Sequence, residues 1–178
     1  MSALPWPPEP LRTERLLLRE PEAGDRAALV ELMSSAEVGR FIGGSRPREE
    51  VERDLPDPPR RRPGLWVVEH DGATIGAVML DPRDAADQGN LRPDVVTELG
   101  YLFLPDGWGR GYATEACAGV LRWFDGTGPG SPVALCTRTA NLGSMRVAAK
   151  LGFTEAGRFH AFDAEQWLGV RAPGGEVA

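Results

Sequence analysis

The fold is decided by the stretch Val95-Val-Thr-Glu-Leu-Gly-Tyr-Leu-Phe-Leu-Pro-Asp-Gly-Trp-Gly-Arg-Gly-Tyr-Ala-Thr-Glu115. Residues 95–104 are apolar on both alternating faces, as expected for a central strand, and Pro105 ends the run. Apolar residues then recur at helical spacing from Ala113 to Phe124, which predicts an amphipathic helix. A glycine-rich loop therefore joins a buried strand to a helix.

The segments around this unit also alternate between strands and helices. We expect strands at 11–20, 65–69, 74–80 and 133–138, helices at 27–33 (N-capped by Asp25) and 144–151, and two last strands around Phe162. The proline-rich segment 45–64 is expected to form a flap with a short helix at 48–55. The fold class is α/β (α+β), with one domain at 11–172 between tails at 1–10 and 173–178.

Composition excludes several classes of protein. The 178 residues carry 20 Lys plus Arg against 26 Asp plus Glu, a net charge of −6. This acidity disfavours nucleic acid or an anionic membrane as partner and suits an amine or a basic peptide. We expect neither a signal peptide nor a membrane-spanning stretch. Cys117 and Cys136 lack metal-ligand spacing, so we expect free thiols in a cytoplasmic protein and no metal. As a separate expectation, the protein is a monomer or a homodimer.

The glycine loop is a candidate anion site. Glycines allow a positive φ and a close approach of ligand to backbone, while the first amides of the following helix have no intrahelical acceptor. Together they suit phosphate groups. The glycine spacing matches neither a P-loop nor a dinucleotide fingerprint, and a tight turn without a ligand is the alternative.

Glu98 is the only charged residue within 95–104, and it shares a strand face with Gly100 and Leu102. Partial desolvation would raise the pKa of this carboxyl toward a value useful for a general base. A structural glutamate paired with an arginine at the sheet edge is the alternative.

Three runs, Glu98 to Glu115, Asn141-Leu-Gly-Ser144 and Lys150-Leu-Gly-Phe153, resemble the GCN5-related N-acetyltransferase (GNAT) superfamily. With the opening Leu11-Arg-Thr-Glu-Arg-Leu-Leu-Leu-Arg19, the chain is similar to the branch that includes ribosomal-protein N-terminal acetyltransferases. The resemblance covers nearly the whole chain. It implies a mixed, mostly antiparallel, twisted sheet of six to seven strands with about four helices, whose central strands splay around acetyl-CoA.

The resemblance also implies which residues bind the cofactor. The pyrophosphate would lie on Gly109, Arg110, Gly111, Tyr112, Ala113 and Thr114, with backbone amides as donors and Arg110 as an added charge. The pantetheine arm would pair with the backbone of Leu102, Phe103 and Leu104. Leu102 N–H would donate to the thioester oxygen, and Asn141 would bind the pantetheine amides. One departure is Trp108, where the family often has Gln or Arg.

Glu98 matches the family's catalytic glutamate. The thiol that leaves has a pKa of about 8.5, so a hydrogen-bond donor suffices to assist it. The tyrosine that many relatives use for this task is replaced here by Ala148. Ser144 is expected near the sulfur instead. Asn141 and Ser144 are also ordinary helix-start residues, and this alternative is compatible with a catalytic role.

The predicted activity is direct transfer of an acetyl group from acetyl-CoA to a primary amine. We favour a protein or peptide N-terminus as acceptor over a small amine such as a polyamine, amino acid or antibiotic. A non-catalytic acyl-CoA-binding module is the alternative of another class. By resemblance, the acceptor cleft is expected to be lined by flap residues between Phe41 and Leu65 and by Phe159, His160, Phe162, Asp163 and Trp167.

Overall fold

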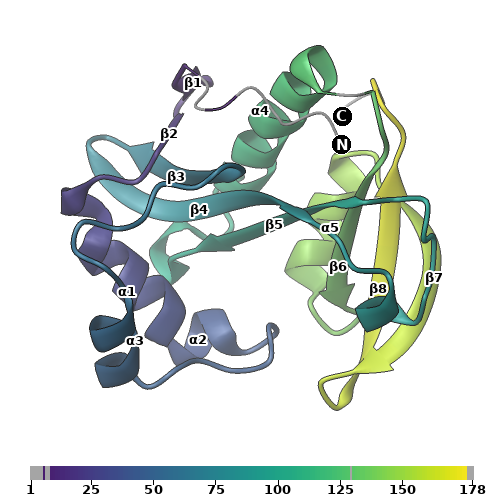
Figure 1. The fold of residues 1–178 in the computed structure, drawn as a ribbon, viewed down its shortest axis with the longest axis horizontal. Coiled ribbons are helices and arrows are strands. Elements are labelled where there is room, and N and C mark those ends of the chain that lie inside the picture. The colour runs from purple at the N-terminus through teal and green to yellow at the C-terminus, as the bar shows by residue number, and fades with distance from the viewer. Residues whose placement is uncertain (1–5, 7–8, 129, 176–178) are drawn as a thin grey trace.

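The computed structural model describes residues 6, 9–128 and 130–175, so most of the expected tail 1–10 and the end of the tail 173–178 lie outside the described residues. Within them, one sheet has eight strands in the order β1-β2-β3-β4-β5-β6-β8-β7 (Figure 1). The elements are β1 (Leu11–Arg12), β2 (Leu17–Arg19), α1 (Arg26–Ser34), α2 (Ala36–Gly39), α3 (Arg48–Asp54), β3 (Leu65–His70), β4 (Ala73–Pro82), β5 (Thr97–Phe103), α4 (Tyr112–Thr127), β6 (Val133–Arg138), α5 (Leu142–Lys150), β7 (Thr154–Ala161) and β8 (Ala164–Arg171).

The sheet is mixed and mostly antiparallel, because among the described strands only β5 and β6 pair in parallel. The expected fold class is confirmed, with one or two more strands than predicted. The helix at 113–124 lies within α4, the strand at 133–138 is β6, and Gly152 follows α5 with a φ of +80°. No helix among the described residues is long and apolar enough to cross a membrane.

Residues 11–20, expected as one strand, form a hairpin, which explains one of the additional strands. Leu11 of β1 lies opposite Leu18 of β2. In the turn, Thr13 N–H donates to the Leu16 carbonyl at 3.0 Å, and Leu16 N–H donates to the Thr13 hydroxyl at 3.1 Å. A threonine side chain that bonds nearby backbone competes with a continuous strand.

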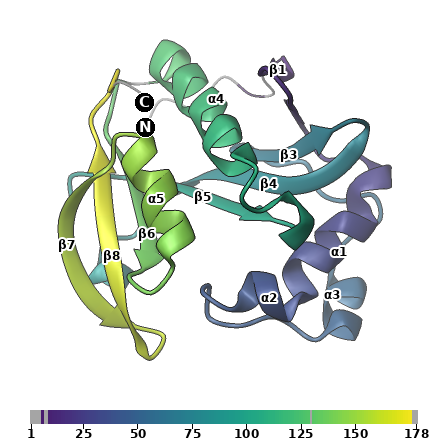
Figure 2. The same cartoon turned by 180° about the vertical axis from the view of Figure 1, so that it is seen from behind.

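Helices cover the two faces of the sheet, with α4 and α5 on one and α1 to α3 on the other (Figure 2). Side chains of β5 alternate between these layers. Leu99 and Phe103 belong to the buried cluster of α4, while Leu102 packs with Leu29 and Leu32 of α1. The apolar run on both strand faces is thus explained by burial on both sides.

The sheet opens between β5 and β6. The only residue pair that joins them among the described residues is Glu98 with Ala134. Beyond Glu98, β5 continues along β4, whereas β6 continues along β8. The splay expected from the family resemblance is therefore present, and it leaves one edge of β5 free.

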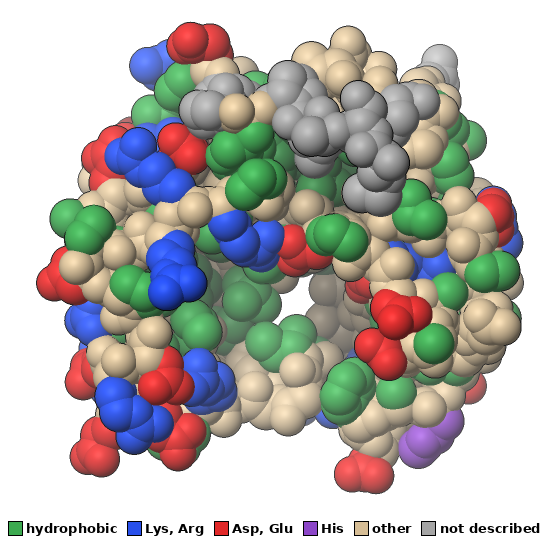
Figure 3. Space-filling view, viewed as in Figure 1, with side chains coloured by type: hydrophobic (Ala, Val, Ile, Leu, Met, Phe, Trp, Pro, Cys, Tyr) green, Lys and Arg blue, Asp and Glu red, His purple; other side chains and the backbone are tan. Residues whose placement is uncertain are grey.

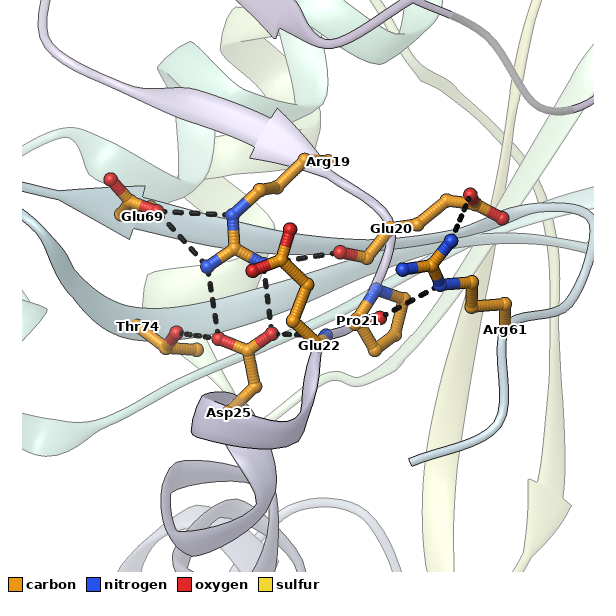
Figure 4. Close-up of polar contacts among 8 residues, drawn as sticks. All are labelled: Arg19, Glu20, Pro21, Glu22, Asp25, Arg61, Glu69 and Thr74. Carbon is orange, nitrogen blue, oxygen red and sulfur yellow. Dashed lines mark hydrogen bonds and ion pairs between the residues drawn. The ribbon is translucent and has the colours of Figure 1, made fainter. Parts of the chain in front are cut away.

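A polar network fastens the start of α1 to the sheet (Figure 4). Both Nη atoms of Arg19 donate to the Asp25 carboxylate, at 2.8 and 3.1 Å, and Arg19 also pairs with Glu69 at 3.0 Å. Asp25 precedes α1 as predicted, but its side chain does not cap that helix. It accepts from Thr74 of β4 and from Glu22 N–H in the turn before the helix instead.

The flap lies against α1 and the segment that follows β2. Val51 of α3 is fully buried, and Arg26 of α1 donates to the carbonyls of Glu52 and Leu55. Arg61 donates to the Pro21 carbonyl at 3.3 Å (Figure 4). The short helix expected at 48–55 is confirmed, and the flap is anchored on the face that carries α1.

We expect Thr74→Val to lower the free energy of unfolding by about 2 kcal/mol at pH 7. Burial raises the pKa of Asp25, but the hydrogen bonds from Arg19, Thr74 and Glu22 N–H outweigh it and hold the pKa below its ordinary value. A lowered folded pKa stabilises the protein above the unfolded pKa, and this stability is lost as pH falls through the folded pKa. The deficit of the variant should therefore shrink at acidic pH in urea unfolding. Thr127→Val is the control, because Thr127 donates only to the neutral Trp123 carbonyl. A deficit that does not change with pH would contradict this account.

Candidate active site

A cavity of about 1210 Å³ lies where β5 and β6 separate. In the space-filling view an opening passes through the middle of the molecule (Figure 3). The walls come from β5, the glycine loop, α5, β6, the segment that contains α2, and the turn between β7 and β8. One cavity thus joins the residues predicted for the cofactor to some of those predicted for the acceptor.

Most predicted site residues lie in its wall. The residues that line it are Glu98, Leu102, Phe103, Gly109, Gly111, Tyr112, Ala113, Thr114, Asn141 and Ser144. Leu104 and Arg110 do not line it. Leu104 packs in the cluster of α1, and the Arg110 carbonyl accepts a hydrogen bond from Arg15 at 3.0 Å.

The glycine loop has the geometry of an open helix N-terminus. Gly109 and Gly111 have φ values of +73° and +80°, which suit glycine. Gly111 is the N-cap of α4, and no side chain among the described residues caps the helix. The first amides of α4 are thus left without a side-chain acceptor, as an anion site requires. Trp108 donates through Nε1 to the Phe103 carbonyl at 2.7 Å and so ties the loop to β5.

Charge is divided across the cavity. Arg146 and Lys150 line it from α5, one helical turn apart. Glu37, Asp87 and Glu98 line it elsewhere. The cavity can hold a polyanion along α5 and α4 and a cation beside the carboxylates.

Glu98 is held by an uncharged partner. Gln88 Nε2 donates to its Oε2 at 2.5 Å, and Gln88 Oε1 accepts from Arg83 Nε at 2.5 Å. Arg83 is buried and donates to backbone carbonyls of the loop before β5, including Leu91 at 2.6 Å. Burial raises the pKa of Glu98, and Gln88 and Arg83 offset part of this rise. No arginine pairs directly with Glu98 among the described residues, so the ion-pair alternative does not apply.

Ser144 receives a partner that the sequence did not suggest. The Tyr101 hydroxyl donates to Ser144 Oγ at 2.9 Å, and burial raises the pKa of Tyr101, so this phenol stays protonated. Ser144 N–H donates to Asn141 Oδ1 at 3.1 Å, so the helix-capping alternative is also present. With its oxygen accepting from Tyr101, Ser144 can direct its own proton into the cavity. Tyr101 lies 43 positions away, and its only sequence signal is a hydroxyl on the strand face opposite Glu98.

The direction of the β5 amides corrects one expectation. Leu104 N–H donates to Ile75 of β4, and Arg83 N–H of β4 donates to Val96, both at 2.9 Å. The register between these pairs is uninterrupted. The N–H groups of even-numbered β5 residues therefore bond to β4, and those of odd-numbered β5 residues face the opening between β5 and β6. Leu102 N–H thus points toward β4, whereas Tyr101 and Phe103 carry the amides on the cavity side.

The acceptor wall differs from the expectation in part. Phe41, Ile42, Phe159 and Phe162 line the cavity, but no flap residue from 45 to 64 does, because the flap packs on α1. His160, Asp163 and Trp167 do not line it either. Trp167 is buried and donates to Glu155 at 2.9 Å. The segment around α2 supplies the missing wall, and this four-residue helix is too short for a periodicity signal.

Cys136 also lines the cavity. Burial and the charge of Glu98 raise the pKa of its thiol to about 12. The thiolate is the nucleophilic form of cysteine, and it is scarcely populated at neutral pH with such a pKa. Cys136 is therefore a poor candidate for carrying an acyl group.

The family model of the acetyltransferase (GNAT) domain matches residues 15–154. The uncharacterized protein YkkB of Bacillus subtilis is 28% identical over 149 residues, which cover 80% of this chain and 83% of YkkB. The structure of RimL, a ribosomal L7/L12 alpha-N-protein acetyltransferase, superimposes with a TM-score of 0.66 at 14% identity, covering 92% of this chain and 94% of RimL. That of AAC(6')-Ib, in complex with ribostamycin and coenzyme A, gives a TM-score of 0.67 at 18% identity and covers 89% and 94%.

Proposed function

The chain belongs to the acetyltransferase (GNAT) family and is an acetyl-CoA-dependent N-acetyltransferase, and from this premise we propose that its acceptor is the N-terminal amine of a protein or peptide. The observation that carries the proposal is the cavity, which has carboxylates on its wall and an opening through the molecule. The ammonium group of a peptide N-terminus would be attracted to these carboxylates. The rest of the extended peptide would stay outside the cavity. The fold is shared with RimL, named for its action on a ribosomal protein, and equally with AAC(6')-Ib, so the choice of acceptor class rests on the cavity.

In the proposed reaction, Glu98 accepts a proton from the acceptor ammonium. The free amine then attacks the thioester carbon, so that a C–N bond forms and the C–S bond breaks. The buried position of Glu98 favours this role because the raised pKa makes the carboxylate a stronger base. Cys136 stays protonated, which favours direct transfer over an acyl-enzyme.

The developing oxyanion needs a donor on the free edge of β5. We assign it to Tyr101 N–H, the first odd-numbered amide beyond Leu99, which flanks the Glu98–Ala134 pair with β6. Ser144 then stabilises the departing thiolate by a hydrogen bond and keeps its own proton, since a serine hydroxyl is a far weaker acid than a thiol of pKa about 8.5. Glu98 passes this first proton to solvent and then accepts the second proton, which the nitrogen loses as the amide forms. The thiolate is protonated from solvent, so the reaction releases one proton overall.

We expect Gln88→Leu to shift the acid limb of the pH profile of kcat/KM toward higher pH. The Gln88 hydrogen bond lowers the pKa of Glu98, so its loss raises that pKa further. The base acts only when deprotonated, and activity therefore appears at a higher pH than in the unaltered protein. Rates on the alkaline plateau should change little. A limb that stays in place or moves to lower pH would show that Glu98 is not the titrating base.

The acceptor proposal is tested by measuring thiol release from acetyl-CoA with peptides of varied first residue. Identical peptides with acetylated N-termini are the matched control, and a panel of polyamines, amino acids and aminoglycosides is the second arm. We expect turnover with free N-termini alone among the peptides. Turnover confined to small amines would overturn the acceptor class. Coenzyme A binding without turnover on any amine would favour the non-catalytic module.

A further inference from the structure

The opening motif at residues 11–19 takes no part in the proposed reaction, yet it touches the glycine loop. Arg15, in the turn between β1 and β2, lies beside the start of α4. We propose that Arg15 is a positioning residue for acetyl-CoA, which fixes the Gly111 N–H in the direction that the pyrophosphate requires. The inference rests on the proposed placement of the pyrophosphate on this loop.

The guanidinium of Arg15 is held on several sides. Its Nε donates to Glu115 Oε2 at 2.7 Å, and its Nη1 donates to the Arg110 carbonyl at 3.0 Å. The guanidinium carbon Cζ of Arg15 lies 4.6 Å from the centre of the Tyr112 ring. Glu115 is itself fixed, because its Oε1 accepts from Arg15 N–H at 2.8 Å and from the Thr13 hydroxyl at 2.5 Å. The fork of one arginine thus joins a carboxylate of α4 to a single carbonyl of the loop.

That carbonyl belongs to the peptide between Arg110 and Gly111. In a planar trans peptide, the C=O and the following N–H point in opposite directions. Holding the carbonyl toward Arg15 therefore turns the Gly111 N–H away from Arg15. Gly111 lines the cavity and Arg110 does not, which places this amide on the side of the ligand.

Without this bond the peptide could rotate. Glycine accepts either sign of φ at little cost, so a peptide next to Gly111 has a low barrier to exchanging its C=O and N–H directions. The exchanged form would present a carbonyl, with its partial negative charge, to the pyrophosphate. Arg15 stabilises the productive form before the cofactor arrives.

The contribution of Arg15 is directional more than electrostatic. Burial raises the pKa of Glu115, but bonds from Thr13 and from the backbone and side chain of Arg15 hold it below its ordinary value. Glu115 is therefore ionised and neutralises Arg15. A neutral ion pair adds little long-range attraction for phosphate. The planar guanidinium still holds Glu115 and the Arg110 carbonyl in a fixed relative direction.

The test compares acetyl-CoA with S-acetylpantetheine, which lacks the pyrophosphate and the nucleotide. For Arg15→Met we expect about a tenfold rise in the Kd of coenzyme A by calorimetry and about a tenfold fall in kcat/KM for acetyl-CoA, with kcat/KM for S-acetylpantetheine unchanged. Thr13→Val is the matched control, since Thr13 also binds Glu115 but does not touch the loop. It should bind coenzyme A within about twofold of the unaltered protein.

Arg15→Lys separates geometry from charge. Lysine keeps the charge but cannot reproduce the fork that spans Glu115 and the Arg110 carbonyl, so it should resemble Arg15→Met. Full affinity of Arg15→Lys would overturn the inference, as would an equal loss with both thioesters. Binding of coenzyme A needs no acceptor, so an error in the proposed acceptor leaves this measurement intact. Unchanged coenzyme A binding in Arg15→Met would overturn the role of Arg15. Unchanged binding in Gly109→Ala as well would show that the pyrophosphate does not lie on this loop.

Discussion

Replacing Glu98 by Gln should lower kcat by about 100- to 10,000-fold, the range typical for loss of a general base, while the Kd of coenzyme A stays within about twofold. The substitution keeps the size of the side chain, and its amide oxygen can still accept from Gln88 Nε2, which lies 2.5 Å from the carboxylate. What it removes is a base whose pKa burial has raised. The cofactor contacts lie elsewhere in the cavity, so binding of coenzyme A should not follow the rate.

Asp87→Asn is the matched control for Glu98→Gln. Asp87 is an exposed carboxylate on the wall of the same cavity. If it attracts the acceptor without touching the reacting atoms, its loss raises KM for the amine and leaves kcat near normal. Steady-state kinetics at saturating acetyl-CoA measure both parameters. Near-normal kcat in Glu98→Gln would refute the base assignment. An equal loss of kcat in Asp87→Asn would mean that Glu98 acts only through its negative charge, as Asp87 does, and not as a specific base.

Local patterns in the sequence were sufficient for the central part of the fold. The apolar run 95–104 is buried on both faces of β5, and the helical spacing after it falls within α4. The burial of Glu98 could also be predicted, because a lone charge in an apolar strand must share the environment of its neighbours. Each of these features depends on residues that lie only a few positions apart in the sequence.

Features that depend on distant pairing were not predictable in the same way. The alternation of side chains assigns Leu102 to a strand face, but it does not say whether the Leu102 N–H bonds to β4 or faces the splay. That choice is made by the register with β4, in which Leu102 lies opposite Ala77, 25 positions earlier in the chain. Likewise the break of segment 11–20 at Thr13 is reinforced by Glu115, 102 positions later. Tyr101 and Ser144 meet only when β5 and α5 close the cavity.

Gly109→Ala should weaken coenzyme A binding about 100-fold, or about 2.7 kcal/mol. Gly109 has a φ of +73°, where a side chain costs roughly 1–2 kcal/mol. The loop can relieve this strain only by moving to a negative φ, which turns its amides away from the phosphates. Each charge-assisted hydrogen bond lost in this way costs about 1.5–3 kcal/mol. One lost bond in this range accounts for the expected change, since a loop that has moved no longer carries the strain.

Gly72→Ala isolates the effect of the ligand from the strain itself. Gly72 has a φ of +78° in the turn between β3 and β4, and a Cβ at either glycine meets no atom within 4 Å. The two variants should therefore lose similar stability, about 1 kcal/mol in thermal unfolding, but only Gly109→Ala should lose affinity in calorimetric titration with coenzyme A. Equal affinities would place the pyrophosphate away from this loop. A loss of affinity in both variants would mean that the strain spreads through the sheet, since the Gly72 turn reaches the start of α4 through the 3.1 Å contact of His70 with the Tyr112 hydroxyl.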